Sequence, residues 1–334
     1  MPAARARLDV DADMLEGLSR RGRRVAGRSR ASRERSGESM TVQRILLAGA
    51  TGAVGLELLR LLRARGGFVR TLSRAEGNAA RVRGLASEVV VADAAEPGAV
   101  AGALDGIELL VSCLGANVSM SLRERRSYHE VDVVANTHLL EAAKRAGTKR
   151  FVYLSAHPGP GYAHTRYLSA HLQMEELIRA SGISFSFVRP TGIYTSLSDM
   201  ITMARAGLGV VVGDGLARTN PVHPVDVAEA LAEVLTGGPD VVPVGGPDVM
   251  TRDEVMRLAF DAVGKEGQMV HVPAGVFRAT SVLLAGIHPR LSDLLEFVAA
   301  VTASDSVAPA RGTRPLRAWF EALAGVQAGR QGDG

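Results

Sequence analysis

The sequence predicts an α/β protein, with a doubly wound parallel sheet followed by a small C-terminal lobe. Short apolar runs alternate with longer stretches of helical period from Arg44 to Pro190, the pattern of parallel strands joined by helices. Many of the 37 glycines stand beside the short runs, where tight strand-to-helix turns need them. The chain is 46% hydrophobic but only 4% aromatic, which favours an aliphatic α/β core over a β-sandwich.

The expected elements follow from these runs in chain order. The predicted strands are bounded by turn-forming or charged residues and lie at 45–48, 68–72, 89–92, 109–113, 151–154 and 183–188. The predicted helices between them cover 53–65, 98–104, 128–146 and 164–181. After Pro190 the alternation weakens, although 241–244 is typical of a strand and "TRDE" at 251–254 of a helix-opening capping box. Asp226 is the expected N-cap of a helix ending near residue 235.

The N-terminal segment differs from the rest of the chain. Residues 1–39 hold ten arginines and six acidic residues, and 20–37 have almost no apolar content, so we expect a disordered extension. A nucleic-acid-binding arm is a less favoured alternative, because "TVQRILLAGATG" after Met40 is typical of the start of a domain. We expect one domain over 40–190 and a smaller substrate-side lobe with a C-terminal tail over 191–334.

Composition also bears on compartment and partners. Cys113 is the only cysteine, which excludes an internal disulfide framework and indicates a reducing compartment. No apolar stretch approaches the roughly 18–20 residues that span a bilayer, and the N-terminus lacks the apolar core of a signal peptide. We therefore expect a cytoplasmic monomer or homodimer with no membrane partner and no nucleic-acid partner.

The segment "ILLAGATGAVGLELLRLL" combines a strand, a glycine turn and an amphipathic helix. In such a loop the first glycine permits the tight turn, the second lets backbone approach a pyrophosphate, and the third lets the helix pack close to the strand. The helix N-terminus adds N–H donors and a positive dipole end. The segment therefore predicts a Rossmann-like dinucleotide site formed by Gly49, Thr51, Gly52, Ala53, Val54 and Gly55.

Residues at the ends of the later strands indicate which dinucleotide binds. An acid about 20 residues beyond the glycines would bind the ribose 2′-hydroxyl of NAD, but Ser73 and Arg74 stand there. Arginine pairs with a 2′-phosphate, so we expect NADP and regard NAD as less favoured. Asp93 ends the third strand as either an adenine contact or a turn cap. Leu114 and Gly115 follow the fourth strand, where glycine lets backbone approach the cofactor.

Several motifs in a fixed order support a family resemblance. The glycine loop is followed by "VDVVANTHLLEAAKRAGTKRFVYLSA", "FVRPTGIY" and "GDGLARTNPVHPVDVAEAL". This series, over about residues 42–325, resembles the atypical, NmrA-like branch of the short-chain dehydrogenase/reductase superfamily. The resemblance implies that nicotinamide lies between the ends of the fourth and fifth strands and a loop containing Pro190, Thr191 and Ile193. It also implies a catalytic serine, tyrosine and lysine.

The catalytic set maps onto this chain with one departure. Ser155 matches the serine that binds the substrate carbonyl, Tyr167 matches the proton donor, and His171 stands where the lysine belongs. Neutral histidine still donates to a ribose, but it activates the tyrosine only when protonated, and its reference pKa of about 6.5 makes that a minority state at pH 7. We expect that Asp132, if it lies close, raises the pKa of His171.

Two alternatives concern the same segment. Tyr162 and Arg166 form a second Tyr-x-x-x-cation register, although Tyr162 follows "PGPG" and is expected in a loop. Three histidines recur every seven residues, but without a cysteine partner or an H-E-x-x-H pattern we expect no metal: His157, His164 and His171.

The expected function is an NADP(H)-dependent oxidoreductase that reduces or oxidises a small, apolar carbonyl-type substrate by hydride transfer. The alternative is a non-catalytic NADP(H)-binding redox sensor or scaffold, which the missing lysine favours and the retained Ser155 and Tyr167 oppose. A nucleotide-sugar epimerase or dehydratase is a third reading, less favoured because the C-terminal lobe is small.

Overall fold

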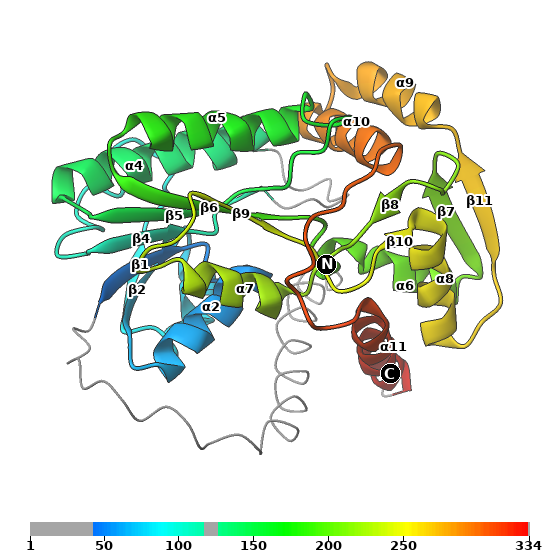
Figure 1. Cartoon of the computed structure of the whole chain (residues 1–334), viewed down its shortest axis with the longest axis horizontal. Helices are drawn as coiled ribbons and strands as arrows, with labels where there is room; N and C mark the ends of the chain where they lie inside the picture. Colours follow the sequence, from blue (N-terminus) through cyan, green and yellow to red (C-terminus); the bar gives the residue numbers. More distant parts are fainter. Residues whose placement is uncertain (1–42, 117–125, 333–334) are drawn as a thin grey trace.

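The structure, a computed structural model, describes residues 43–116 and 126–332. Its centre is a parallel seven-stranded sheet with the order β3-β2-β1-β4-β5-β6-β9 (Figure 1). The order reverses between β1 and β4, and in open parallel sheets ligands bind at the carboxyl ends of strands at such a point. The strands are β1 (Arg44–Ala48), β2 (Phe68–Ser73), β3 (Glu88–Val91), β4 (Leu109–Ser112), β5 (Arg150–Leu154), β6 (Ser184–Pro190) and β9 (Val241–Val244).

Helices cover both faces of this sheet, as Figure 1 shows. Neighbouring strand residues such as Leu46 and Leu47 point to opposite faces, and both are completely buried. The Leu47 face packs on α2 (Ala53–Ala64) and α7 (Pro224–Glu233). The Leu46 face packs on α4 (Ala135–Ala146) and α5 (Arg166–Ala180). The predicted Rossmann-like, doubly wound sheet is therefore confirmed.

The predicted strands all form, each within two residues of its expected range, and 241–244 forms as β9. The predicted helix at 98–104 is wrong. Hydrogen bonds between backbone groups of residues three positions apart form a series of turns there, because Gly98 and Gly106 adopt positive φ. A short helix α3 (Glu76–Ala80) was not predicted.

Three further helices differ in how closely their starts match the prediction. The predicted helix at 128–146 begins as a π-helix, η1 (His129–Val134), before α4. His223, not Asp226, caps α7: its Nδ1 accepts a hydrogen bond from Val225 N at 3.1 Å, and Asp226 lies in the first helical turn. The capping box of Thr251 with Glu254 is confirmed.

The C-terminal lobe has its own core, centred on Met256, Trp319 and Phe320. Two small sheets belong to it, one pairing β7 with β11 in parallel and one pairing β8 with β10 antiparallel. Its elements are η2 (Tyr194–Leu197), α6 (Asp199–Arg205), β7 (Leu208–Val212), β8 (Arg218–Thr219), β10 (Met250–Thr251), α8 (Arg252–Val263), β11 (Gln268–Val272), α9 (Ala274–Leu284), α10 (Pro289–Thr302) and α11 (Leu316–Gly332).

The chain returns from this lobe to the central sheet to supply α7 and β9. The domain boundary at residue 190 stays a prediction, and the expected arginine-rich extension lies outside the described residues. None of the described helices is long and apolar enough to cross a membrane.

A segment that we call the strap, residues 305–314, ties the lobe to the sheet. Asn220 exchanges two hydrogen bonds with the Ala308 backbone, accepting from its N at 3.0 Å and donating to its O at 2.8 Å. The guanidinium of Arg314 pairs with the buried carboxylate of Asp226 in α7. The strap therefore satisfies polar groups that the earlier part of the chain buries.

Alanine at Gly55 tests the packing of α2 on β1. A Cβ at Gly55 would lie 2.2 Å from the Gly49 carbonyl oxygen, so the helix must move away. We expect Gly55→Ala to lower the free energy of unfolding by about 1–3 kcal/mol in urea titrations, the usual cost of overpacking. Gly77→Ala in α3 is the control, since a Cβ there meets nothing within 4 Å and is expected to stabilise by about 0.5–1 kcal/mol. Equal destabilisation by both variants would contradict this account.

Candidate active site

The glycine loop leaves the N-terminus of α2 open. Gly49 has φ +80°, and a Cβ there would lie 2.4 Å from the Cys113 carbonyl oxygen at the end of β4. Gly52 is the exposed N-cap of α2, and no side chain of the described residues caps that helix. The free amides of the first turn, together with glycines that have no side chain to block them, form a cradle that fits the pyrophosphate of a dinucleotide.

Polar groups at the ends of β2 and β3 fit the adenosine end of the same ligand. The Ser73 hydroxyl is buried, and within the described residues it has no hydrogen-bond partner. Arg74 follows it and is exposed. The Asp93 carboxylate caps Ala95 N at 3.1 Å and receives Arg126 Nη2 at 2.7 Å, and the Arg126 hydrogen bond is the main cause that lowers the pKa of Asp93. The turn cap is therefore present, while the adenine contact stays a prediction.

Four residues form a line beyond the ends of β4 and β5, which we call the site row: Gly115, Asp132, His171 and Tyr167. A Cβ on Gly115 would lie 3.0 Å from Asp132 Oδ1 and 4.0 Å from His171 Cε1. Asp132 Oδ1 lies 3.5 Å from His171 Nε2, and the Tyr167 ring meets the His171 ring edge-on with centroids 4.9 Å apart. The structure thus brings together the predicted proton donor, the histidine and the glycine beside the cofactor loop.

Hydrogen bonds fix the orientation of the histidine. The Tyr153 hydroxyl lies 2.9 Å from His171 Nδ1. If the phenol donates, a neutral ring that accepts at Nδ1 carries its proton on Nε2, which faces Asp132. The other carboxylate oxygen, Asp132 Oδ2, accepts from Ala116 N at 3.1 Å. Both ring nitrogens of His171 therefore face protein groups, and its contact with a ribose stays a prediction.

Burial makes the site row electrically neutral. Desolvation raises the pKa of Asp132 to about 8 and lowers the pKa of His171 to about 4, so at pH 7 the acid keeps its proton and the imidazole is uncharged. The expectation that Asp132 raises the pKa of His171 is wrong, because both groups are buried and the cost of desolvation outweighs their attraction. Burial, with Asp132 as a smaller cause, also raises the pKa of Tyr167, whose hydroxyl keeps its proton.

Comparison with known proteins agrees with this geometry. A family described as NAD(P)H-binding matches residues 49–237, more than half of the sequence. The chain belongs to the NAD(P)H-binding family. The predicted resemblance to atypical short-chain dehydrogenase/reductase proteins is thereby confirmed.

Relatives of this NAD(P)H-binding protein include enzymes of different chemistry. It is 28% identical over 283 residues to divinyl chlorophyllide a 8-vinyl-reductase, chloroplastic, from Zea mays, covering 76% of this chain and 68% of that one. It is 31% identical over 169 residues to sterol demethylase protein B of Methylococcus capsulatus, covering 44% and 51%. The NADPH-dependent quinone oxidoreductase QOR2 of Escherichia coli has the same fold, with a TM-score of 0.63 and 18% identity over 85% of this chain and 99% of that one.

Ser155 lies at the end of β5 in this NAD(P)H-binding protein, and its hydroxyl is already engaged. Ser155 Oγ donates to Glu175 Oε1 at 2.6 Å, and the same carboxylate accepts from Arg189 Nε at 2.8 Å. A serine hydroxyl has a single proton, so as placed it has none for a substrate carbonyl. Its catalytic role stays a prediction. Sequence reasoning missed Glu175 and Arg189, although Glu175 follows His171 by one helical turn on the same face.

Tyr162, the alternative proton donor, contacts the strap. Tyr162 is buried, with its hydroxyl 2.7 Å from Ser306 Oγ in the strap, and Arg166 Nη1 lies 2.5 Å from Asp293 Oδ1. This register is therefore anchored to the C-terminal lobe.

Tyr128 was not predicted: its ring lies 5.2 Å from that of Tyr167, and its buried hydroxyl lacks a partner among the described residues. Only the fold brings Tyr128 to this place.

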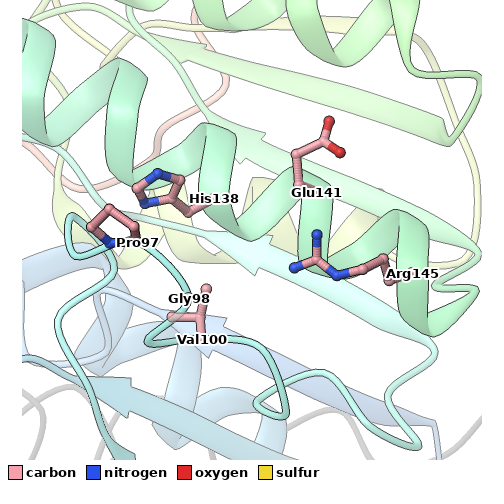
Figure 2. Close-up of a pocket in the computed structure, with 6 residues that line it drawn as sticks. All are labelled: Pro97, Gly98, Val100, His138, Glu141 and Arg145. Carbon is pink, nitrogen blue, oxygen red and sulfur yellow. The ribbon is translucent and has the colours of Figure 1, made fainter.

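Two contacts hold the loop that contains "RPTG" in place. Thr191 Oγ1 donates to Asn220 O at 2.5 Å, and Ile193 pairs with Val222, so both anchor the loop that follows Pro190. Figure 2 shows a recess between α4 and the turns at 97–100, which is lined by none of the site row residues. In the described residues no group of three or more His, Cys, Asp or Glu side chains is placed to hold a metal ion.

Replacing Asp132 with asparagine tests the buried proton. Between the unfolded pKa of 3.8 and the folded pKa of about 8, folding takes up a proton, so Asp132 destabilises the wild type increasingly as pH rises. The lowered pKa of His171 makes stability rise with pH instead, but only below about pH 6.5, where the unfolded histidine binds a proton. From pH 6.5 to 8 we expect Asp132→Asn to gain about 1–2 kcal/mol in unfolding free energy over wild type. Exposed Asp105→Asn is the control, and a pH-independent difference for Asp132→Asn would contradict burial of the neutral acid.

Proposed function

We propose that the protein is a cytoplasmic NADP(H)-dependent reductase of a small, apolar carbonyl-type or conjugated acceptor. The observation that carries this proposal is the site row, which places a protonated tyrosine beside the ends of β4 and β5, next to the cofactor loop. The relationship to a vinyl-reductase over three quarters of the chain supports a reductase.

The residues that would hold the cofactor follow from the cradle. The amides at the start of α2 would bind the pyrophosphate, the Ser73 hydroxyl the adenosine ribose, and Arg74 a 2′-phosphate. When bound, NADPH supplies a hydride. The Ser73 hydroxyl, which has no partner among the described residues, supports this assignment, since buried hydroxyls are rarely left without a hydrogen bond.

Tyr167 would supply the proton of the reaction. Burial raises the pKa of its hydroxyl, so the group keeps its proton at neutral pH and can deliver it, although as a weaker acid than a free tyrosine. His171, held by Tyr153 and facing Asp132, would keep the Tyr167 ring in place without contributing charge. This arrangement favours reduction, which consumes a proton, over oxidation, which requires the tyrosinate.

A second function, a non-catalytic NADP(H)-binding redox sensor, is supported by one observation. The Ser155 proton is donated to Glu175, and no permanent cation replaces the missing lysine at position 171. Consumption of NADPH in the presence of an acceptor distinguishes the reductase from the sensor.

Tyr167→Phe tests the reductase directly. We expect NADPH consumption with a panel of quinones, enones and aldehydes to fall about 100-fold or more in kcat, because general acid catalysis contributes about 10²–10⁴. The dissociation constant for NADPH, measured by fluorescence titration, is expected to stay unchanged.

The matched control is Tyr162→Phe, which removes the hydroxyl that bonds Ser306 and is expected to keep kcat. Tight NADPH binding without turnover in the wild type, on every acceptor of the panel, would favour the sensor. Equal kcat for wild type and Tyr167→Phe would remove Tyr167 as the proton donor.

Arg74→Ala tests the choice of cofactor. Loss of a hydrogen bond between charged groups costs about 1.5–3 kcal/mol, so we expect the dissociation constant for NADPH to rise about 10- to 100-fold. The value for NADH is expected to stay constant. Arg83→Ala removes a cation of the exposed pair with Glu76 and serves as control. Wild-type affinity for NADH as high as for NADPH would contradict the NADP assignment.

A further inference from the structure

Helix α9 and the turn after it expose several apolar side chains, while Ser281 of the same helix is buried. Ser281 is 8% exposed, with its hydroxyl 3.2 Å from that of Ser292 in α10. Val282, Leu283 and Ile287, in contrast, are 75%, 76% and 76% exposed. A helix on a water-facing surface normally turns its apolar stripe to the core. The orientation of α9 therefore indicates a surface that is covered by something apolar.

The position of α9 makes this surface a projection and not a groove. The helix packs on α10 at an outer corner of the molecule (Figure 1). α10 in turn reaches the site row, where Phe297 lies with its ring 4.5 Å from that of Tyr167. The apolar projection is thus one helix away from the proposed proton donor.

The charge of this region restricts what can cover it. Residues 267–292 contain no aspartate or glutamate. Arg278 lies on the exposed part of α9, and Asp293, the next acidic residue, is buried against Arg166. An apolar face that carries the exposed Arg278 and has no acidic residue beside it complements a layer that is apolar inside and negatively charged at its surface.

The size of the face argues against a second copy of the chain. The 11 residues of α9 form a helix about 16 Å long. One side of such a helix is far smaller than the roughly 800 Å² per partner of a specific protein interface. A fluid layer, by contrast, surrounds a small projection on all sides.

We propose that α9 and the following turn at 285–287 insert into the interfacial region of an anionic lipid bilayer. This departs from the expectation of no membrane partner, which considered only segments that span a bilayer. An interfacial helix needs an apolar face and flanking cations but no spanning length. Lipid binding does not depend on the proposed reduction, and its test needs no turnover.

The first experiment measures co-sedimentation of the full chain with vesicles of phosphatidylcholine and of phosphatidylcholine mixed with phosphatidylglycerol. We expect the double variant Val282→Asp, Leu283→Asp to bind the mixed vesicles at least ten-fold more weakly than the wild type. Leu216→Asp, at another exposed leucine, is the control and should bind like the wild type. Unchanged NADPH affinity checks that the variants are folded. Because all three chains keep the arginine-rich residues 1–39, their difference reports on α9 alone.

A second experiment locates the contact. The only native tryptophan, Trp319, is buried, so Val282→Trp in a Trp319→Phe background reports on α9. We expect its emission to shift to shorter wavelength when mixed vesicles are added, and Leu216→Trp in the same background to show no shift. Equal vesicle binding by wild type and double variant, or no shift at position 282, would overturn the proposal. A wild-type dimer that the double variant converts to monomer, without lipid binding, would assign the face to a second copy.

Discussion

The approach of the Gly49 carbonyl to the backbone of Gly55 determines where the rest of the site lies. It brings α2 closer to β1 than any side chain would allow, and the same turn presses Gly49 against Cys113 at the end of β4. Two residues beyond Cys113 the chain reaches Gly115, where the site row begins. Backbone packing thus places the amides of α2 close to the end of β4 and Gly115. From Gly115 the side chains of Asp132 and His171 connect to Tyr167 of α5.

The site row carries no charge at neutral pH, where the family resemblance implies a lysine at position 171. A lone imidazolium or carboxylate in this buried position would carry a large solvation cost, and the neutral forms of His171 and Asp132 avoid it. Glu175, one turn beyond His171 in α5, forms an ion pair with Arg189 of β6 and accepts the hydrogen bond of the Ser155 hydroxyl. The polar groups around Tyr167 therefore supply orientation, and its acidity is set by burial.

The sequence allowed the fold to be predicted further than the site. Strand periodicity and the glycine turn are local signals, so the strands and the loop from Gly49 to Gly55 were predicted correctly. The helix expected at 98–104 failed because glycine conformation outweighed helical period. The pKa values of Asp132 and His171 depend on burial by distant segments. Tyr128 and the Ser155–Glu175 bond likewise arise only from tertiary packing, for which single-residue patterns hold no signal.

The strap binds polar groups that are synthesised well before it. During translation the strands and α7 leave the ribosome well before residues 305–314 do. Until then the Asn220 amide and the Asp226 carboxylate, both buried in the finished protein, have no partners in Ala308 and Arg314. Two polar groups that the middle of the chain buries thus receive these partners only from residues that are synthesised 88 positions later.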